Sequence, residues 1–320
     1  MSEFRIGTRK SAMALAQTRE VVARLQAAVP GLHALIHTRE PRGDRDQVSR
    51  LDRHGGKGGA FVAEIRADVL AGRARAAMHS LKDMPGNEEV GDLVVAAYLP
   101  RDDPRDALVL HPDVREADVR TIGTNAVRRA ALLPRHFPQA EIVHYRGAAD
   151  TRIAKLDERR TQALPDGGEV GPVDAIVLAA SGLERIGRAD RIARRFSTSE
   201  MLPAVGQGIV AVECAAADFE TRALLAKIDH ADSRTCATAE REVLWVLDGH
   251  CNSPIAGHAT TDGDTLELHA AVMSADGKTV LRAAASGPRA FPRELGRRVA
   301  FDLIEQGAPG LIAASETAHV

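Results

Sequence analysis

The chain has 320 residues, of which 44% are hydrophobic, and this is enough for two or three domains with cores of their own. Its 42 Lys and Arg residues nearly balance its 44 Asp and Glu residues, so the net charge of −2 gives no long-range attraction to nucleic acid or to an acidic membrane. Aromatic residues make up only 3% of the chain, so stacking platforms for single-stranded nucleic acid are scarce. We expect no nucleic-acid partner.

Cysteine usage and the N-terminus restrict the class of protein further. Cys214, Cys236 and Cys251 are odd in number and widely spaced, which excludes a disulfide framework and a cysteine zinc site. We therefore expect no metal. The N-terminus lacks a basic region followed by an apolar core, and no apolar run approaches the ~18 residues of a membrane span. These features predict a cytoplasmic protein with no membrane partner.

Hydrophobic periodicity alternates between strands and helices in the first hundred residues. It predicts strand 4–8, helix 12–28, strand 34–39, a polar, glycine-rich stretch at 41–59, helix 60–71 and strand 76–79. Ser11 is a suitable cap for the first helix, and Pro30 and Gly31 end it. This order is typical of βαβ units on a parallel sheet.

The segment 99–106, LPRDDPRD, carries two prolines and five charges and predicts a domain boundary. A second alternation follows, with strand 120–123, helix 126–133, strand 141–145, helix 151–160 and strand 175–179. Residues 163–172 predict a surface loop.

The last third changes character after the segment 201–208. It predicts a strand that ends at Glu213, helices 219–228 and 235–247, strands 256–260, 266–272 and 279–285, and helix 293–306. Consecutive strands joined by the turns DGD and ADGK indicate a small α+β domain.

Arginines recur where a predicted strand ends or a predicted helix begins, at Arg9, Arg128, Arg129, Arg146 and Arg152. Ligands of open α/β sheets bind at the carboxyl ends of the strands, and a guanidinium holds a carboxylate in a bidentate fork. The arginines therefore predict a ligand with several carboxylates. Arginines on solvated helix faces are the alternative interpretation.

Lys82 and Asp83 directly follow a predicted strand in the motif HSLKDMP. An aspartate there could stabilise a developing cation or move a proton, and the lysine could bind a carboxylate of the substrate. A local ion pair in a turn is the alternative. His79 is interpreted as a hydrogen-bonded neighbour of the strand end.

Two further motifs allow two interpretations each. Lys57 lies in GGKGG, which could be a flap over an anionic ligand or a surface loop, and Gly58 stands where a phosphate loop needs Ser or Thr. Cys251 lies in a turn-like stretch between a helix and a strand. Its thiolate could be a nucleophile, or its thiol could pack as a small apolar group.

Nine motifs follow one another over almost the whole chain: IGTRKSAMALAQ, GGKGGAF, HSLKDMP, DPRDAL, GTNAVRR, YRGAADTR, SGLERIG, LPAVGQG and GHCNSPIAG. Together they closely resemble the porphobilinogen deaminase (hydroxymethylbilane synthase) family. The resemblance implies an α/β fold with two periplasmic-binding-protein-like lobes of mainly parallel sheets and a small C-terminal α+β domain. The implied domains are 1–99 with 201–217, 105–199, and 220–320.

The resemblance also implies an activity in tetrapyrrole (heme) biosynthesis. Members of the family are transferases that condense four porphobilinogen molecules head to tail, release ammonia each time, and free hydroxymethylbilane by hydrolysis. A dipyrromethane cofactor would be bound as a thioether to Cys251, and the chain would be a monomer. The expected catalytic residues are Lys82 and Asp83. The expected cofactor-binding residues are Ser80, Lys82, Asp83, Thr124, Asn125, Arg128, Arg129, Arg146, Gly147 and Cys251. The expected substrate-binding residues are Arg9, Ser11, Gln17, Lys57, Arg152 and Arg185.

Some positions depart from the family pattern. Asn125 and Ala126 stand where a serine pair is common, Ala148 stands where asparagine is frequent, and His250 replaces a frequent glycine. These changes concern affinity and rate rather than the type of reaction. A non-catalytic binder of a polycarboxylate, or a paralogue that joins other pyrroles, stays open as an alternative.

Overall fold

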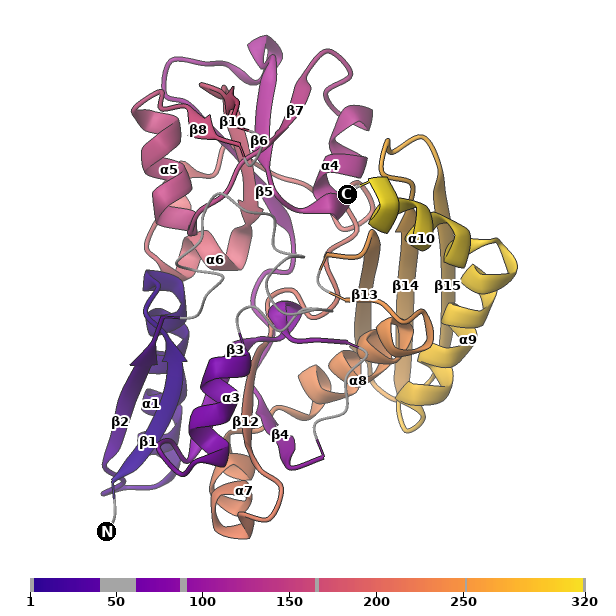
Figure 1. Cartoon of the computed structure of the whole chain (residues 1–320). Coiled ribbons are helices and arrows are strands. Elements are labelled where there is room, and N and C mark those ends of the chain that lie inside the picture. The colour runs from indigo at the N-terminus through magenta and orange to yellow at the C-terminus, as the bar shows by residue number, and fades with distance from the viewer. Residues whose placement is uncertain (1–2, 41–61, 87–90, 165–166, 251, 319–320) are drawn as a thin grey trace.

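The computed structural model describes residues 3–40, 62–86, 91–164, 167–250 and 252–318. They form two five-stranded sheets of mixed direction, a three-stranded antiparallel sheet and a two-stranded hairpin (Figure 1). No described helix is long and apolar enough to cross a membrane.

The first sheet has the order β2-β1-β3-β12-β4. Its strands are β1 (Phe4–Arg9), β2 (Ala34–Arg39), β3 (Ala76–Ser80), β4 (Leu93–Tyr98) and β12 (Val210–Ala215). Four strands run in one direction, and β12 lies antiparallel between β3 and β4. The helices around this sheet are α1 (Ala12–Ala28), α3 (Ala63–Leu70) and α7 (Phe219–Leu225). Since β12 follows all strands of the second sheet in the sequence, the chain leaves the first sheet and returns to it.

The second sheet has the order β11-β5-β10-β6-β7. Its strands are β5 (Asp106–Leu110), β6 (Thr121–Thr124), β7 (Glu141–His144), β10 (Ala175–Ala179) and β11 (Arg194–Arg195). Here too four strands run in one direction, and β5 opposes them. Its helices are α4 (Val127–Leu132), α5 (Ala149–Asp157) and α6 (Ala180–Arg185), and β8 (Gln162–Ala163) pairs with β9 (Glu169–Val170) in a hairpin.

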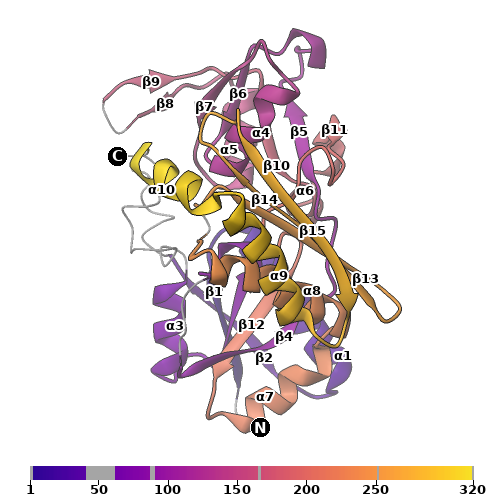
Figure 2. The ribbon, with the colours of Figure 1, turned by 90° about the vertical axis from the view of Figure 1, so that its right-hand side faces the viewer.

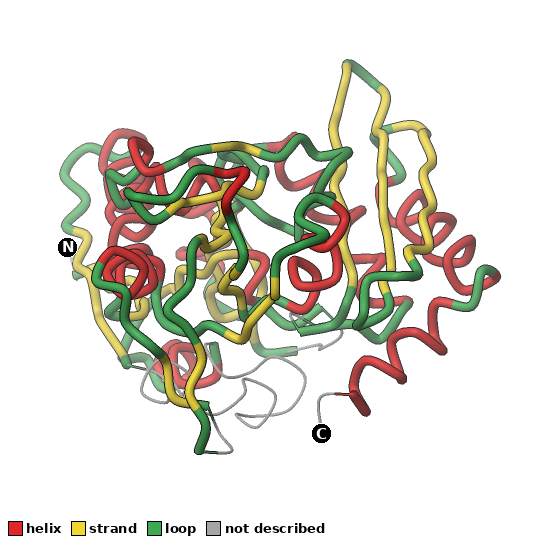
Figure 3. The backbone as a smooth tube through the Cα atoms, turned by 90° about the horizontal axis from the view of Figure 1, so that it is seen from above, coloured by secondary structure: helices red, strands yellow, loops and turns green. Residues whose placement is uncertain are grey.

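The third sheet consists of β13 (Ile255–Asp262), β14 (Thr265–Met273) and β15 (Val280–Pro288). The helices α8 (Ala231–Val246), α9 (Pro292–Glu305) and α10 (Ala308–Ala318) accompany it, and Figure 2 shows α9 and α10 in front of it. Seen from above, this unit lies to one side of the other two sheets (Figure 3). Short 3-10 helices complete the described chain: η3 (Leu81–Asp83), η4 (Glu116–Asp118), η5 (Leu133–Arg135), η6 (Ala189–Arg191) and η7 (Ala226–Ile228).

The third sheet shares a hydrophobic core with the second. Ala256, Ala271 and Met273 pack with Leu132 of α4 and Ile122 of β6. The C-terminal unit is therefore anchored on the second lobe through buried apolar contacts, which stabilise it in proportion to the area removed from water.

The structure confirms the predicted fold class, with two α/β lobes whose strands run mainly in one direction and a small C-terminal α+β unit. Several elements differ from the sequence prediction. The strands β4 and β5 and the helix α10 were not predicted, and the predicted loop 163–172 contains part of the β8–β9 hairpin. Helix α8 begins at Ala231 rather than at residue 235, because the ring of His230 accepts the backbone N–H of Ser233 and caps the helix there.

Helix α7 lies against the first sheet, although residues 220–228 were expected in the C-terminal domain. Leu225 and Ile228 pack in one core with Val21 of α1 and Val212 of β12. The amphipathic pattern of residues 219–228 predicted the helix but did not indicate which sheet it covers.

Two segments cross between the first and second lobes and lie side by side. On the outgoing segment, Leu99 donates its backbone N–H to Val210 (2.9 Å), and Asp102 donates its N–H to Gly208 (3.2 Å). Gly208 has a φ of +89°, and a Cβ atom there would lie 2.5 Å from the carbonyl oxygen of Asp102. Glycine is therefore required for the close approach of the two crossing segments.

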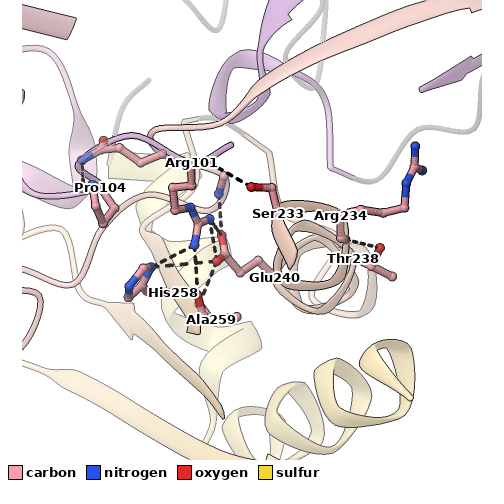
Figure 4. Close-up of polar contacts among 10 residues, drawn as sticks. Arg101, Pro104, Ser233, Arg234, Thr238, Glu240, His258 and Ala259 are labelled. Carbon is pink, nitrogen blue, oxygen red and sulfur yellow. Dashed lines mark hydrogen bonds and ion pairs between the residues drawn. The ribbon is translucent and has the colours of Figure 1, made fainter. Parts of the chain in front are cut away.

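Glu240 of α8 joins these crossing segments to the third sheet (Figure 4). Its carboxylate accepts two hydrogen bonds from the guanidinium of Arg101, at 2.7 and 2.8 Å, and backbone N–H groups from Gly206 and Ala259, both at 2.7 Å. Arg101 also donates to the carbonyl oxygen of Ala259 and contacts the ring of His258. Glu240 is fully buried, so these donors replace the water that it loses on folding.

We predict that Glu240→Gln lowers the free energy of unfolding by about 3–5 kcal/mol, because it leaves the guanidinium of Arg101 without its counter-ion. Urea unfolding followed by circular dichroism measures this effect. Glu267→Gln is the matched control, since the side chain of Glu267 is 57% exposed and forms a surface pair with His269. Equal midpoints for the two variants would contradict this role of Glu240.

Candidate active site

A cavity lies between the first and second lobes, where β3 and β6 end and α1, α4 and α5 begin. Its described lining combines five cationic side chains with one carboxylate. The charged lining residues are Arg9, Lys82, Asp83, Arg128, Arg129 and Arg152. An excess of cations in a partly enclosed space favours a ligand with several negative charges.

The wall from the first lobe follows directly from the end of β3. The strand ends at Ser80, and the 3-10 helix η3 then presents Lys82 and Asp83 to the cavity. Arg9, at the end of the neighbouring strand β1, lies 3.6 Å from the carboxylate of Asp83. The side chain of Asp83 keeps 32% exposure, so part of this carboxylate is accessible to a ligand.

Helix α1 begins at the same wall. Ser11 caps the helix by accepting the N–H of Ala14, and both residues line the cavity. One turn later, Gln17 exchanges hydrogen bonds of 2.9 and 3.0 Å with the hydroxyl of Ser80. Because α1 begins at the cavity wall, the positive end of its helix dipole adds to the electric field that attracts an anion.

The wall from the second lobe is built on a buried carboxylate, Asp106, at the start of β5. Arg128 and Arg129 of α4 approach it to 2.7 and 2.9 Å, and the side-chain amide of Gln207 donates to it at 3.0 Å. Burial would raise the pKa of Asp106, but the charges of the two guanidinium groups outweigh it and lower that pKa. Asp106 therefore stays ionised and holds both arginines in place.

Arg152 of α5 faces the cavity with much less compensation. One of its terminal nitrogens lies 3.5 Å from the side-chain oxygen of Asn125, and its Nε is buried with no hydrogen-bond partner in the described part of the chain. Burial and the charge of Arg129 lower the pKa of Arg152. A ligand carboxylate would relieve both effects.

Lys82 makes no ion pair within 4 Å among residues 3–40, 62–86 and the other described ranges. Burial, followed by the charges of Arg129 and Arg128, lowers its pKa from the ordinary 10.5 to about 8, although Asp83 and Asp106 act in the opposite direction. A lysine with this pKa is still mostly protonated at neutral pH and can exchange a proton near it.

A buried ion cluster supports β3 behind this wall. Glu213 of β12 accepts two hydrogen bonds from Arg66, at 2.8 and 2.9 Å, and lies 3.2 Å from Nε2 of His79. Burial would raise the pKa of Glu213, but His79 and Arg66 hold it at about 2. His79 also lines the cavity, so this cluster fixes the strand that carries Lys82 and Asp83.

Most of the predicted site residues meet in this cavity. The described members are Arg9, Ser11, Gln17, Ser80, Lys82, Asp83, Asn125, Arg128, Arg129, Gly147 and Arg152. Lys57 and Cys251 lie outside the described residues.

Three predicted residues lie elsewhere in the described structure. Thr124 is buried, and its hydroxyl accepts the N–H of Ala126. Arg146 is buried next to the lining residue Gly147, and its backbone N–H donates to Gln162. Arg185 lies at the crossing segments, 2.6 Å from the carboxylate of Asp102, and donates to the carbonyl oxygen of Gly208.

Four residues at or beside the cavity were not predicted from the sequence: Asp106, Gln207, Asn252 and Ser253. Asp106 belongs to the segment 99–106, which was interpreted only as a domain boundary. Gln207 lies in the motif LPAVGQG, which gave no reason to single out its glutamine. Asn252 and Ser253 line the cavity together with Ile255. Their place directly after Cys251 in the sequence was the signal that could have found them.

Models of known families match this chain in two parts. The description "Porphobilinogen deaminase, dipyromethane cofactor binding domain" matches residues 4–223, and "Porphobilinogen deaminase, C-terminal domain" matches residues 234–305. The chain belongs to the porphobilinogen deaminase family. Among the described residues, no group of three or more His, Cys, Asp or Glu side chains could hold a metal ion.

Curated relatives from the same family align with this chain over nearly its full length. The chain is 40% identical over 317 residues to a porphobilinogen deaminase from Chromobacterium violaceum, which covers 98% of both chains. It is 43% identical over 318 residues to porphobilinogen deaminase 2 from Streptomyces coelicolor, which covers 97% of this chain and 96% of that one. Among solved structures, it is similar to an ABC transporter from Parabacteroides distasonis, at 11% identity and a TM-score of 0.39, over 71% of this chain and 72% of that one.

The described residues fit a dipyrromethane cofactor with carboxylate substituents. Nε of Arg152 is a buried donor without a partner, and the side-chain oxygen of Gln207 is a buried acceptor without one. The first suits a carboxylate, and the second suits a pyrrole N–H. Both residues line the cavity next to Lys82 and Asp83.

We predict that Lys82 titrates near pH 8 in the protein with no ligand bound. Acetylation by limiting acetic anhydride across pH 6–11, read by peptide mass spectrometry, measures this because only the neutral amine reacts. Lys278, with 86% side-chain exposure, is the internal standard for reagent reactivity. Asp83→Asn should lower the midpoint further, because Asp83 raises the pKa of Lys82. A midpoint near the ordinary 10.5 would contradict the prediction.

Proposed function

We propose that this chain is a hydroxymethylbilane synthase, a transferase that condenses four porphobilinogen molecules head to tail with release of ammonia. Hydrolysis then frees hydroxymethylbilane for tetrapyrrole biosynthesis. The observation that supports this most directly is Asp83, a partly exposed carboxylate among the five cationic side chains of the described lining. A simple carboxylate receptor would have no use for an anion at this position.

Asp83 stabilises the positive charge that develops on the substrate. Loss of ammonia from porphobilinogen leaves an azafulvenium cation, and a carboxylate in a poorly solvated site stabilises such a cation more than it would in water. Arg9 places an opposite charge 3.6 Å from this carboxylate, on the wall that β1 and β3 share. Lys82, on the same turn, holds a carboxylate of the substrate and can exchange a proton near neutral pH.

The arginines of the second lobe hold the acetate and propionate groups that each pyrrole ring carries. Arg128 and Arg129 are fixed by Asp106. The buried Nε of Arg152 has no hydrogen-bond partner among the described residues and can donate to a ligand. A bidentate guanidinium–carboxylate contact fixes orientation as well as charge. These side chains would hold the cofactor and the incoming substrate in line with Asp83.

Cys251 is the proposed attachment point of the dipyrromethane. Its sequence neighbours Asn252 and Ser253 line the cavity, and the hydroxyl of Ser253 accepts the N–H of His250 across the turn. When bound, the cofactor supplies the pyrrole carbon to which the first substrate molecule is joined. Thr124, Arg146 and Gly147 are proposed to support it from the floor of the second lobe.

We assign the remaining predicted roles as part of the same proposal. Lys57, outside the described residues, is proposed to act on the anionic ligand as the family resemblance implies, and Arg185 is proposed to act on substrate as well as on the crossing segments. The proposed lobes are residues 1–99 with 201–217 and residues 105–199, as expected from the sequence, and the first lobe also takes in residues 219–228, because Leu225 and Ile228 pack in its core. The protein acts as a monomer in the cytoplasm without a nucleic-acid partner, as the net charge of −2 and the family resemblance favour.

We predict that Asp83→Asn lowers turnover of porphobilinogen by at least about a thousandfold, because the developing cation loses its counter-charge. Ammonia release and product formation measure turnover, and circular dichroism checks the fold. Asp113→Asn is the control, since the side chain of Asp113 is 87% exposed. Near-normal turnover in Asp83→Asn would refute the mechanism.

We predict that the denatured, purified protein exceeds its sequence mass by two pyrrole units, and that Cys251→Ser shows no excess. Intact-protein mass spectrometry makes this measurement. An unmodified protein that also stays unmodified after incubation with porphobilinogen or preformed hydroxymethylbilane would favour the non-catalytic binder. The departures at Asn125, Ala126 and Ala148 would then be the first positions to revert.

A further inference from the structure

A second cavity lies between the first lobe and the C-terminal helices, on α8 and α9. Its described lining residues are Gly86, Tyr98, Thr238, Arg241, Glu242, Trp245, Arg293 and Arg297. It shares none of them with the candidate active site. We call it the Arg241 pocket.

Positive charge exceeds negative charge in the Arg241 pocket. Glu242, which is buried, accepts hydrogen bonds from Arg293 at 2.8 Å and from Arg297 at 2.7 Å. One carboxylate thus serves two guanidinium groups, each with further N–H donors. The side chains of Arg293 and Arg297 are 66% and 54% exposed, so those donors are accessible from solvent.

Arg241 adds a third and less exposed cation. It donates one hydrogen bond, of 2.7 Å, to the carbonyl oxygen of Pro85. No carboxylate in the described ranges forms an ion pair with it. Burial lowers the pKa of Arg241, because the charged form is less well hydrated there than in water. A buried cation without a counter-ion is costly, so an anion in this pocket would be bound with a gain in free energy.

Two aromatic residues complete the pocket. Trp245 is 44% exposed on α8, and Tyr98 is 93% buried at the end of β4. The hydroxyl of Tyr98 makes no hydrogen bond with any residue that the structure describes, so it can donate to an occupant. The indole provides a flat apolar wall for the carbon skeleton of a small ligand.

The backbone keeps this arrangement rigid. A Cβ atom on Gly86 would lie 2.6 Å from the side chain of Leu244, so the chain after η3 contacts α8 directly. Arg293 and Arg297 lie one turn apart on α9, on the face that packs against α8. A site with preformed walls loses little conformational freedom when it binds a ligand.

We propose that the Arg241 pocket binds a small dianion, either a dicarboxylate or a phosphate, between Arg241 and the pair Arg293–Arg297. The two negative charges match the two positive charges that Glu242 leaves uncompensated. Guanidinium groups bind carboxylate and phosphate with the same fork geometry, so the shared chemistry of the ligand is two charge-assisted acceptors.

Trp245 is the only tryptophan of the chain, so intrinsic fluorescence reports on this pocket. We would titrate the full-length protein with succinate and with inorganic phosphate, each against sodium chloride of matched ionic strength. A saturable fluorescence change with either dianion, and none with chloride, is expected. Saturation by succinate alone would identify a dicarboxylate, and saturation by phosphate alone would identify a phosphate. No saturable change with either would overturn the proposal.

Variants decide whether the change arises in the pocket. Arg297→Gln should weaken binding about tenfold, because it removes one charged donor from the dianion. Arg298→Gln is the matched control on the same helix, since Arg298 donates to Ser286 outside the pocket and should change affinity less than about twofold. Arg152→Gln, in the other cavity, should leave the titration unchanged. Unaltered affinity in Arg297→Gln would refute the proposal, as would loss of the signal in Arg152→Gln.

Discussion

A single buried carboxylate, Glu240, holds together the three parts of the chain that meet behind the candidate active site. It accepts from Arg101 on the outgoing crossing segment, from Gly206 on the returning one and from Ala259 on β13. Removal of Glu240 would take the counter-ion from Arg101 and the acceptor from the N–H groups of Gly206 and Ala259, and Glu240 itself could not remain buried without these donors. The relative positions of the two lobes and the C-terminal unit therefore depend on this contact.

The same crossing segments continue into the cavity. Gln207, next to Gly206, donates to the carbonyl oxygen of Pro104 at 2.6 Å and to the carboxylate of Asp106 at 3.0 Å. Asp106 in turn holds Arg128 and Arg129 against the cavity. A change in how the two segments lie would thus shift the arginines that face a ligand. The side chains that connect the two lobes therefore also position the binding surface.

The sequence predicted the parts of the structure that depend on local pattern. Helix α1, with its Ser11 cap, and the alternation of β1, β2 and β3 follow from hydrophobic periodicity and capping. The family resemblance predicted most of the residues that line the cavity. The misses depend on contacts between distant residues: α7 packs on the first sheet through Leu225, and Asp106 gains its role only from arginines more than twenty residues away. No local pattern records which partner a buried charge will meet.

The structure also separates the cationic side chains that have an ion-pair partner from those that have none among the described residues, a difference that the sequence alone does not show. Arg128 and Arg129 share the carboxylate of Asp106, Arg9 faces Asp83, and Arg185 is committed to Asp102 at the crossing segments. Lys82 and Arg152 remain as the lining cations with no ion pair in the described part of the chain. Their pKa values are lowered by the same two causes, first the burial of the charged group and then the nearby positive charge of Arg129. In the proposed function, carboxylates of a growing polypyrrole would remove that penalty. Lys82 and Arg152 would then gain most from each added ring, while the paired arginines would mainly fix its orientation.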